Sequence, residues 1–260
     1  MANRYSQLIE KVFFNSYRKG DMNVLFLREE IEIIARKISI KLPKNIGDIL
    51  YSFRFRNELP KSISQTAPDG YEWLIKLAGR GVYQFSLEEK LEIIPNSNLT
   101  FTKILDSTPG VINKYSFTDE QALLAILRYN RLIDIFLGIA CYSLQNHLRT
   151  TVPNLGQVET DEVYIGIDKK GVHYIVPIQA KAGNDKQGRV QIEQDIELCK
   201  NKFPKLICVP IAAQFMSDGK IALFSFEHNE GIKMLSERHY KLVPPSEFSE
   251  EELLNYMNRT

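Results

Sequence analysis

Two short segments in the second half of the chain carry the residues best suited to chemistry. Val158–Ile167 contains three carboxylates, and Tyr174–Lys181 contains Gln179 and ends on a lysine. Both segments are typical of β-strands, and the polar turn Asp168–Gly171 between them predicts a hairpin. Lys181 on an otherwise apolar strand is unfavourable unless an opposite charge meets it. We therefore expect the acids to lie beside Gln179 and Lys181.

This combination of side chains is suited to the cleavage of phosphodiester bonds. Carboxylate and amide oxygens bind a hard cation such as Mg²⁺, which keeps several of its waters. Such a cation lowers the pKa of a bound water and offsets the charge that develops on the phosphate. A lysine can orient the attacking water or help to deprotonate it. The acids concerned are Glu159, Asp161 and Glu162.

The pattern Asp161…Gln179-Ala-Lys181 resembles the active-site motif of the PD-(D/E)xK nuclease superfamily, which has the restriction-endonuclease-like fold. In that family, an acid on one strand precedes an acid-x-lysine on the next. The resemblance implies that Asp161 is a metal ligand, that Gln179 stands at the second acid, and that Lys181 is the catalytic lysine. Because glutamine replaces an acid, Glu162 or Glu159 is expected to supply the missing negative charge.

Ordinary structural roles are open for the same residues. The acids of the first segment could lie at a solvated strand edge. Gln179 and Lys181 could lie at a strand end from which the lysine reaches water. Asp134, inside an apolar stretch, could reach the site, or it could pair with Arg131 or Arg128 on its own helix.

The segments around these residues predict an α/β domain with a mixed sheet. We expect a long helix from Thr118 to about Leu148, ended by the β-branched residues and proline of 150–153. The resemblance covers about 155–227, where strand, strand, helix and strand follow in the family's order. The further elements expected are a helix at Val190–Lys200, strands at Leu206–Ile211 and Ile221–Phe226, and an acidic helix at Ser249–Tyr256.

The first part of the chain predicts three helices followed by a hairpin. Apolar residues at helical spacing occur in 8–13, 31–38 and 46–53. The β-prone runs Tyr71–Leu77 and Gly81–Ser86 follow, with an arginine at their tip. This order is typical of a winged helix, in which the third helix enters the major groove and the wing touches phosphates.

Charge in the first sixty residues also suits a polyanion. Residues 1–61 hold twelve Lys and Arg against seven Asp and Glu. We expect the third helix, 45–56, to read bases while the hairpin tip and loop 184–189 hold phosphates. A polar helix face and a solvated loop are the alternatives. The residues assigned to DNA binding are Ser52, Arg54, Arg56, Arg80, Lys186 and Arg189.

Composition places the chain among soluble proteins. Its 260 residues are 44% apolar with a net charge of +1. The three cysteines have neither paired nor metal-ligand spacing, and the N-terminus has no apolar signal core. Leu132–Ala140, the most apolar run, is too short to span a bilayer. A cytoplasmic protein with no membrane association is expected.

Together these features predict a winged-helix-like α+β domain at 1–95, a linker at 96–117, and a restriction-endonuclease-like α/β domain at 118–260. The expected function is that of a Mg²⁺-dependent, sequence-specific type II restriction endonuclease. Cutting both strands of a palindromic double-stranded DNA site needs two active sites, so a homodimer is expected. The alternatives are a repair or junction-resolving nuclease, and a catalytically inactive DNA-binding regulator.

Overall fold

The computed structural model describes residues 4–55, 57–91, 93–115, 120–153, 155–182, 188–228 and 231–258. The chain divides into two compact units, which we call the first and second units. The first comprises Met1–Leu91 with Thr150–Val158, and the second comprises Glu92–Arg149 with Glu159–Thr260. Each unit is built around its own hydrophobic core. Within the described ranges, no helix is long and apolar enough to cross a membrane.

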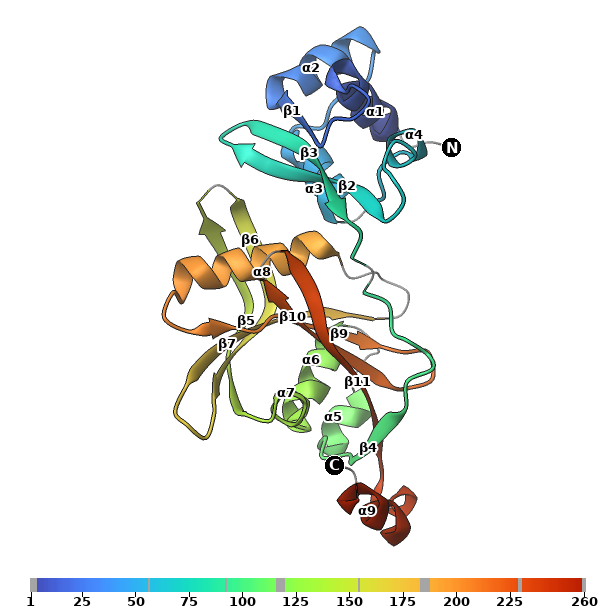
Figure 1. Cartoon of the computed structure of the whole chain (residues 1–260), viewed down its shortest axis with the longest axis vertical. Helices are drawn as coiled ribbons and strands as arrows, with labels where there is room; N and C mark the ends of the chain where they lie inside the picture. The colour runs from blue at the N-terminus through green and yellow to red at the C-terminus, as the bar shows by residue number, and fades with distance from the viewer. Residues whose placement is uncertain are drawn as a thin grey trace. The chain divides into compact units, whose positions relative to one another are not determined.

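The first unit combines helices with a small antiparallel sheet (Figure 1). Its described strands lie in the order β1-β3-β2, so the first strand pairs with the last. The predicted helices and the β2–β3 hairpin are confirmed, whereas β1 and the single-turn α4 were not expected. The elements are α1 (Arg4–Ser16), β1 (Asn23–Leu27), α2 (Arg28–Lys37), α3 (Gly47–Phe55), α4 (Lys61–Ser64), β2 (Tyr71–Gly79) and β3 (Val82–Glu89).

Aromatic rings form the centre of the first unit's core. Phe13 on α1 lies 5.1 Å from Trp73 on β2 and 5.0 Å from Phe85 on β3, measured between ring centroids. Both contacts are edge-to-face, the geometry that the ring quadrupoles favour. The helical face predicted for α1 is confirmed, because Leu8, Ile9, Val12 and Phe13 are all buried.

The second unit is built on a mixed sheet. Its described strands follow the order β4-β11-β10-β9-β7-β6-β5, with β8 also paired to β7. β6 and β7 are antiparallel, whereas β7 and β9 are parallel neighbours. The strands are β4 (Phe101–Leu105), β5 (Ala140–Val152), β6 (Gly156–Ile167), β7 (His173–Lys181), β8 (Ile207–Cys208), β9 (Ile211–Phe215), β10 (Ile221–His228) and β11 (Ile232–Val243).

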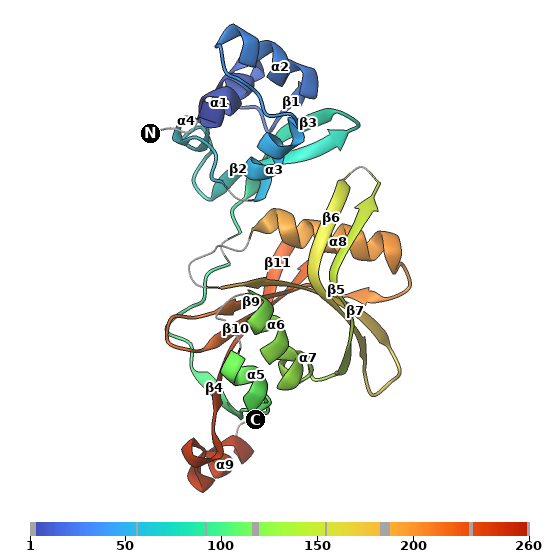
Figure 2. The same ribbon diagram turned by 180° about the vertical axis from the view of Figure 1, so that it is seen from behind.

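Helices lie on both faces of this sheet (Figures 1 and 2). α6 and α7 cover one face, where Leu123 and Leu127 share a core with Val176 and Ile178 of β7. α8 lies on the opposite face, so the predicted α/β arrangement of a mixed sheet flanked by helices is confirmed. The helices are α5 (Gly110–Tyr115), α6 (Glu120–Tyr129), α7 (Leu132–Leu137), α8 (Arg189–Lys202) and α9 (Glu250–Met257).

The long helix expected over 118–148 is wrong. Two short helices, α6 and α7, are followed by β5, and Thr118 itself lies outside the described residues. Arg131 has a left-handed backbone with φ of 51° between the two helices, and Gly138 ends α7 with φ of 69°. The β-branched residues expected to stop the helix instead complete β5, since branched side chains pack well on a pleated strand.

Two other expectations need correction, and one further strand was not expected. The segment predicted as a linker contains β4, which pairs in parallel with β11, and the short helix α5. β11 itself was not predicted. The strand expected at Leu206–Ile211 divides into β8 and β9 around Pro210, which has no backbone N–H to donate to a ladder.

Candidate active site

β6 and β7 form the hairpin that the sequence predicts. They pair over residues 162–167 and 173–178. Asp168 closes the turn, because its Oδ1 accepts two backbone N–H groups of the turn at 2.8 and 2.9 Å. Gly171 adopts φ of 78°, a conformation that favours glycine. The hairpin brings the acidic end of β6 next to the end of β7 that carries the lysine.

Asp161 lies against the backbone of β7. Its Oδ2 accepts the backbone N–H of Ala180 at 2.8 Å. Burial raises the pKa of Asp161 above its usual range, and the Ala180 hydrogen bond and the positive charge of Lys181 oppose that shift. Glu120 raises and His147 lowers the same pKa to a smaller extent. The carboxyl group is thus partly desolvated, and nearby positive charge stabilises its ionised form.

Lys181 forms an ion pair with Glu120. Its Nζ lies 2.7 Å from Glu120 Oε1, and the lysine side chain is 18% exposed. Glu120 is the first residue of α6, where a negative charge interacts favourably with the helix dipole. We call Asp161, Lys181 and Glu120 the acid–lysine site. One weak signal for Glu120 is present in the sequence, an acid near the start of an expected helix.

The side-chain amide nitrogen of Gln179 is directed towards α8. Its Nε2 lies 3.1 Å from both carboxyl oxygens of Asp195 and 3.3 Å from the backbone oxygen of Glu159. Thr160 donates its hydroxyl to Asp195 Oδ1. Burial raises the pKa of Asp195 to about 8. Sequence reasoning missed Asp195, although an acid at helical spacing from Ile192 on an apolar face was a usable signal.

The two glutamates expected as further ligands lie elsewhere. Glu162 is fully buried, and its Oε1 accepts hydrogen bonds from Arg128 at 2.9 and 3.0 Å and from Ser143 at 2.5 Å. Glu159 pairs with Arg149 at 2.7 Å. Because side chains alternate along a strand, Glu162, the residue next to Asp161, need not share its surroundings. The carboxylate that pairs with Lys181 is instead that of Glu120.

Of the two roles that the sequence leaves open for Asp134, the structure shows pairing with a nearby arginine rather than approach to the site. It forms an ion pair with Arg131. Its Oδ1 also accepts the backbone N–H of Cys141 at 2.9 Å, which links α7 to the start of β5. The role of Asp134 is therefore local and structural.

The third helix of the first unit presents fewer free side chains than expected. Ser52 Oγ accepts a hydrogen bond from Asn57 Nδ2 at 2.6 Å. Arg54 is half-buried rather than exposed, and burial lowers the pKa of its guanidinium. Arg56, also assigned to base reading, lies outside the described residues.

Of the three residues expected to hold phosphates, the structure describes two, and these differ in exposure. Arg80 is exposed in the turn between β2 and β3, as predicted. Arg189 is mostly buried, with 9% of its side chain exposed, and its Nε lies 3.1 Å from Glu193 Oε1 on the same helix. Lys186 lies outside the described residues.

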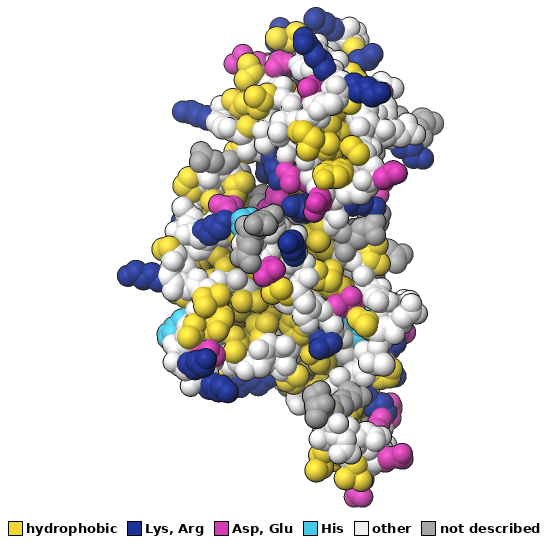
Figure 3. Space-filling model, in the orientation of Figure 1, with side chains coloured by type: hydrophobic (Ala, Val, Ile, Leu, Met, Phe, Trp, Pro, Cys, Tyr) yellow, Lys and Arg dark blue, Asp and Glu magenta, His cyan; other side chains and the backbone are white. Residues whose placement is uncertain are grey.

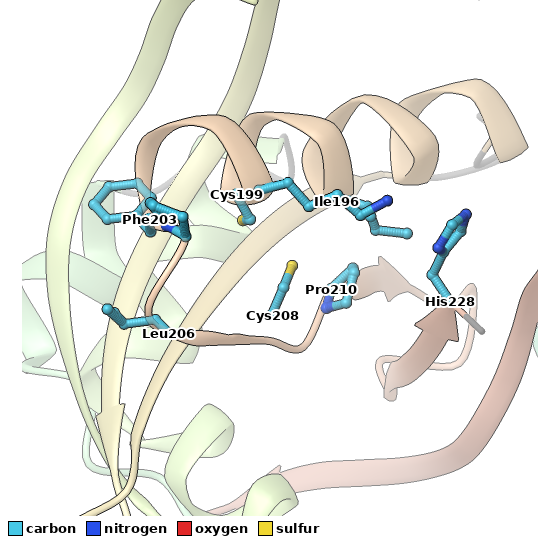
Figure 4. A pocket seen from close by; sticks show the side chains of 9 residues that line it. Ile196, Cys199, Phe203, Leu206, Cys208, Pro210 and His228 are labelled. Atoms are coloured by element: carbon cyan, nitrogen blue, oxygen red, sulfur yellow. The ribbon is translucent and has the colours of Figure 1, made fainter.

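A pocket of about 300 Å³ lies between the C-terminal half of α8 and the segment leading to β9 (Figure 4). Cys199 and Cys208 face each other across it, and Pro210 and His228 lie at its other end. Its walls include none of the residues of the acid–lysine site.

The carboxylate and amide oxygens near the acid–lysine site are suited to a hard cation that is bound by few protein ligands. Among the residues that the structure describes, no three His, Cys, Asp or Glu side chains are grouped so as to hold a metal ion. Mg²⁺ keeps most of its waters and is commonly held by one or two carboxylates together with substrate phosphates. Asp161 with the amide oxygen of Gln179 or the carboxylate of Glu120 matches that minimal oxygen set.

Comparisons of the chain with protein-family models, with curated proteins and with solved structures find no match.

Proposed function

We propose that this chain is a Mg²⁺-dependent DNA endonuclease, and specifically a type II restriction endonuclease. The observation that carries the proposal is the approach of Asp161 and Lys181 at one end of the β6–β7 hairpin. Burial raises the pKa of the Asp161 carboxyl group, and the positive charge of Lys181 opposes that rise. These two residues occupy the acid and lysine positions of the PD-(D/E)xK pattern.

The order of elements supports the same proposal. β6, β7, α8 and β9 follow as strand, strand, helix and strand, the order of the restriction-endonuclease-like fold. β7 and β9 are parallel, and parallel strands need a crossover connection such as the one that α8 provides.

Each polar residue of the site has a distinct role in the proposed reaction. Asp161 and the amide oxygen of Gln179 are the groups that would hold the cation. When bound, Mg²⁺ supplies a water of lowered pKa and offsets charge on the scissile phosphate. Lys181 orients the attacking water, and its ion pair with Glu120 fixes the ammonium group in place. Glu120, rather than Glu162, is the second carboxylate that we assign to the site.

The first unit is proposed to bind the DNA as a winged helix. Its sequence of helices and strands and its β1-β3-β2 sheet support that assignment. Arg80 at the exposed hairpin tip is the phosphate contact that the structure favours most. The half-buried Arg54 is a weaker candidate for base reading than the sequence implied.

A homodimer is proposed because a palindromic site requires two catalytic centres. Exposed apolar side chains support a contact with a second copy. Figure 3 shows hydrophobic side chains gathered on the second unit around α6 and α7. The exposed large apolar residues of α5, α6, α7 and β5 are Val111, Tyr115, Tyr129, Ile135, Tyr142 and Leu144.

Cleavage of a supercoiled plasmid with Mg²⁺ or Mn²⁺ tests the proposal. Wild-type protein is expected to cut, and Lys181→Ala is expected to lose cutting while it remains folded. Lys200→Ala is the matched control, because Lys200 is exposed on α8 and pairs only locally with Glu197 at 2.7 Å.

The products distinguish the candidate functions. Discrete fragments from a mapped phage DNA support a type II restriction endonuclease. Cutting that depends on DNA structure rather than sequence points to a repair or junction-resolving nuclease. Sequence-specific binding without cleavage in either metal contradicts the nuclease proposal and identifies a DNA-binding regulator.

A further inference from the structure

His147 lies on β5 with a backbone conformation that is uncommon for a residue other than glycine. Its φ is 48°, in the left-handed region, where a residue that has a Cβ is strained. Strain of this kind persists only where the surrounding structure holds the residue, and it is frequent at functional sites. His147 is therefore held in place by its neighbours rather than by its own conformational preference.

One neighbour joins the His147 ring to α6. The ring nitrogen Nε2 lies 2.9 Å from the amide nitrogen of Gln121. Gln121 directly follows Glu120, the acid that pairs with Lys181. An amide nitrogen donates hydrogen bonds and does not accept them, so Nε2 accepts here and the proton of the neutral ring is on Nδ1. The hydrogen-bond donor that His147 offers to other groups is therefore its Nδ1–H.

A second neighbour places Nδ1 beside β6. Nδ1 lies 3.7 Å from Oε1 of Glu159, which is beyond direct hydrogen-bonding distance, and the other oxygen of that carboxylate pairs with Arg149. Glu159 and Asp161 are two residues apart on β6, so their side chains project to the same side. In agreement, positive charge on His147 lowers the pKa of Asp161. The His147 side chain is 51% exposed, so its Nδ1–H is accessible to a molecule bound at the acid–lysine site.

We infer that His147 is a further catalytic residue of the acid–lysine site, which donates its Nδ1–H to a phosphate oxygen of the DNA. This inference rests on the proposed function, in which the scissile phosphate binds at this site. The carboxylates of Asp161, Glu120 and Glu159 repel a phosphate, and a donor held beside them offsets part of that repulsion. Phosphate oxygens are negatively charged and accept strong hydrogen bonds.

Two substitutions at position 147 that both tolerate a left-handed backbone test this role. Glycine has no side chain, whereas the amide nitrogen of asparagine lies close to the place of Nδ1 and donates. His147→Gly is expected to weaken DNA binding about 10-fold, the effect of losing one hydrogen bond to a charged group. His147→Asn is expected to bind within about threefold of wild type, because it keeps a donor at that place.

Fluorescence anisotropy of a labelled DNA duplex of mixed sequence, with Ca²⁺ in place of Mg²⁺, provides the measurement. Contacts to phosphates do not depend on base sequence, so the recognition site need not be known. His173→Gly is the matched control. His173 is an exposed histidine at the turn end of the β6–β7 hairpin, opposite Ile167, and its loss should leave DNA affinity unchanged.

Folding of each variant is checked by circular dichroism. If His147→Gly does not fold, His147→Asp is compared with His147→Asn instead. The two side chains have the same shape, but an ionised carboxylate cannot donate a hydrogen bond, so the aspartate variant should bind DNA more weakly than the asparagine variant.

The outcomes separate this inference from the proposed function. Weaker binding by His147→Gly with near wild-type binding by His147→Asn supports the role of the Nδ1–H donor. Unchanged binding by His147→Gly, an equal loss in His147→Asn, or an equal loss in His173→Gly overturns it. Wild-type protein that binds the duplex but does not cut plasmid DNA with Mg²⁺ or Mn²⁺ overturns the nuclease proposal, and the binding affinities still judge His147. Wild-type protein that does not bind DNA overturns both.

Discussion

Asp161 and Glu162 are neighbouring carboxyl groups on one strand, yet their surroundings differ. Asp161 bonds to the β7 backbone and faces the charge of Lys181. Glu162 is fully buried and bonds to Arg128 and Ser143, and we call Arg128 and Glu162 the buried pair. The side on which a strand residue projects, rather than its chemical type, therefore determines which partners its carboxyl group meets.

The largest expected effect comes from neutralising the acid–lysine site. Asp161→Asn should lower the rate of DNA cleavage by about 10²–10³-fold, because several kcal/mol of charge stabilisation are lost with the carboxylate. The Ala180 hydrogen bond can still be accepted by the amide oxygen, so the fold should persist. Plasmid cleavage rates, with circular dichroism to confirm folding, provide the measurement. A cleavage rate within threefold of wild type would remove Asp161 from the site.

Breaking the buried pair should affect stability rather than chemistry. Arg128→Ala leaves the carboxylate of Glu162 buried without its cation, a change that costs about 3–5 kcal/mol when both partners are enclosed. Because the Arg128 side chain is 37% exposed, we expect a smaller loss of about 2–3 kcal/mol. Urea unfolding measures the free energy of unfolding.

The matched control for the buried pair is Arg149→Ala, which removes an arginine from a more exposed ion pair with Glu159. Its effect on unfolding should be below about 1 kcal/mol. Equal effects of the two arginine substitutions would show that Glu162 does not depend on Arg128.

A smaller effect on the cleavage rate is expected from changing Glu120, the acid that pairs with Lys181. Glu120→Gln keeps a hydrogen-bond acceptor for Lys181 but removes the negative charge. The cleavage rate should fall about 3–10-fold, corresponding to about 1 kcal/mol of lost orientation of the ammonium group. Single-turnover cleavage at saturating Mg²⁺ measures it. A loss as large as that of Asp161→Asn would instead make Glu120 an essential metal ligand.

The smallest effect is expected from Glu159, which the sequence offered as a possible second ligand. Glu159→Gln removes an exposed ion pair with Arg149, which contributes less than about 1 kcal/mol to stability. Its cleavage rate and Mn²⁺ affinity should match those of wild type. A tenfold loss of metal affinity would return Glu159 to the ligand set.

The parts of the site that local sequence could predict are those joined by the hairpin. Asp161 and Lys181 are twenty residues apart, but the turn between β6 and β7 determines that they meet. Glu120 and Asp195 reach the site from helices, and their approach depends on how α6 and α8 pack on the sheet. Such tertiary packing leaves only weak traces in a single sequence, an acid at a helix start and an acid on an apolar helix face.

The prediction of the fold from sequence meets the same limit. The prediction of a helix at Val190–Lys200 lies close to the actual bounds of α8, and the apolar face predicted for α1 is buried. The apolar stretch leading into β5 predicts a continuous helix, because a run of apolar residues fits either a helix or a strand. The left-handed backbone at Arg131 separates α6 from α7, and the left-handed backbone at Gly138 ends α7. A left-handed backbone at an arginine cannot be predicted from residue type.

Titration of Mn²⁺ into the wild type, Asp161→Asn and Glu162→Gln tests the central comparison most directly. The two substitutions remove one negative charge each from adjacent residues and preserve side-chain shape. We predict that Asp161→Asn abolishes measurable binding and that Glu162→Gln binds as the wild type does. Retained affinity in Asp161→Asn, or its loss in Glu162→Gln, would contradict the assignment of the acid–lysine site.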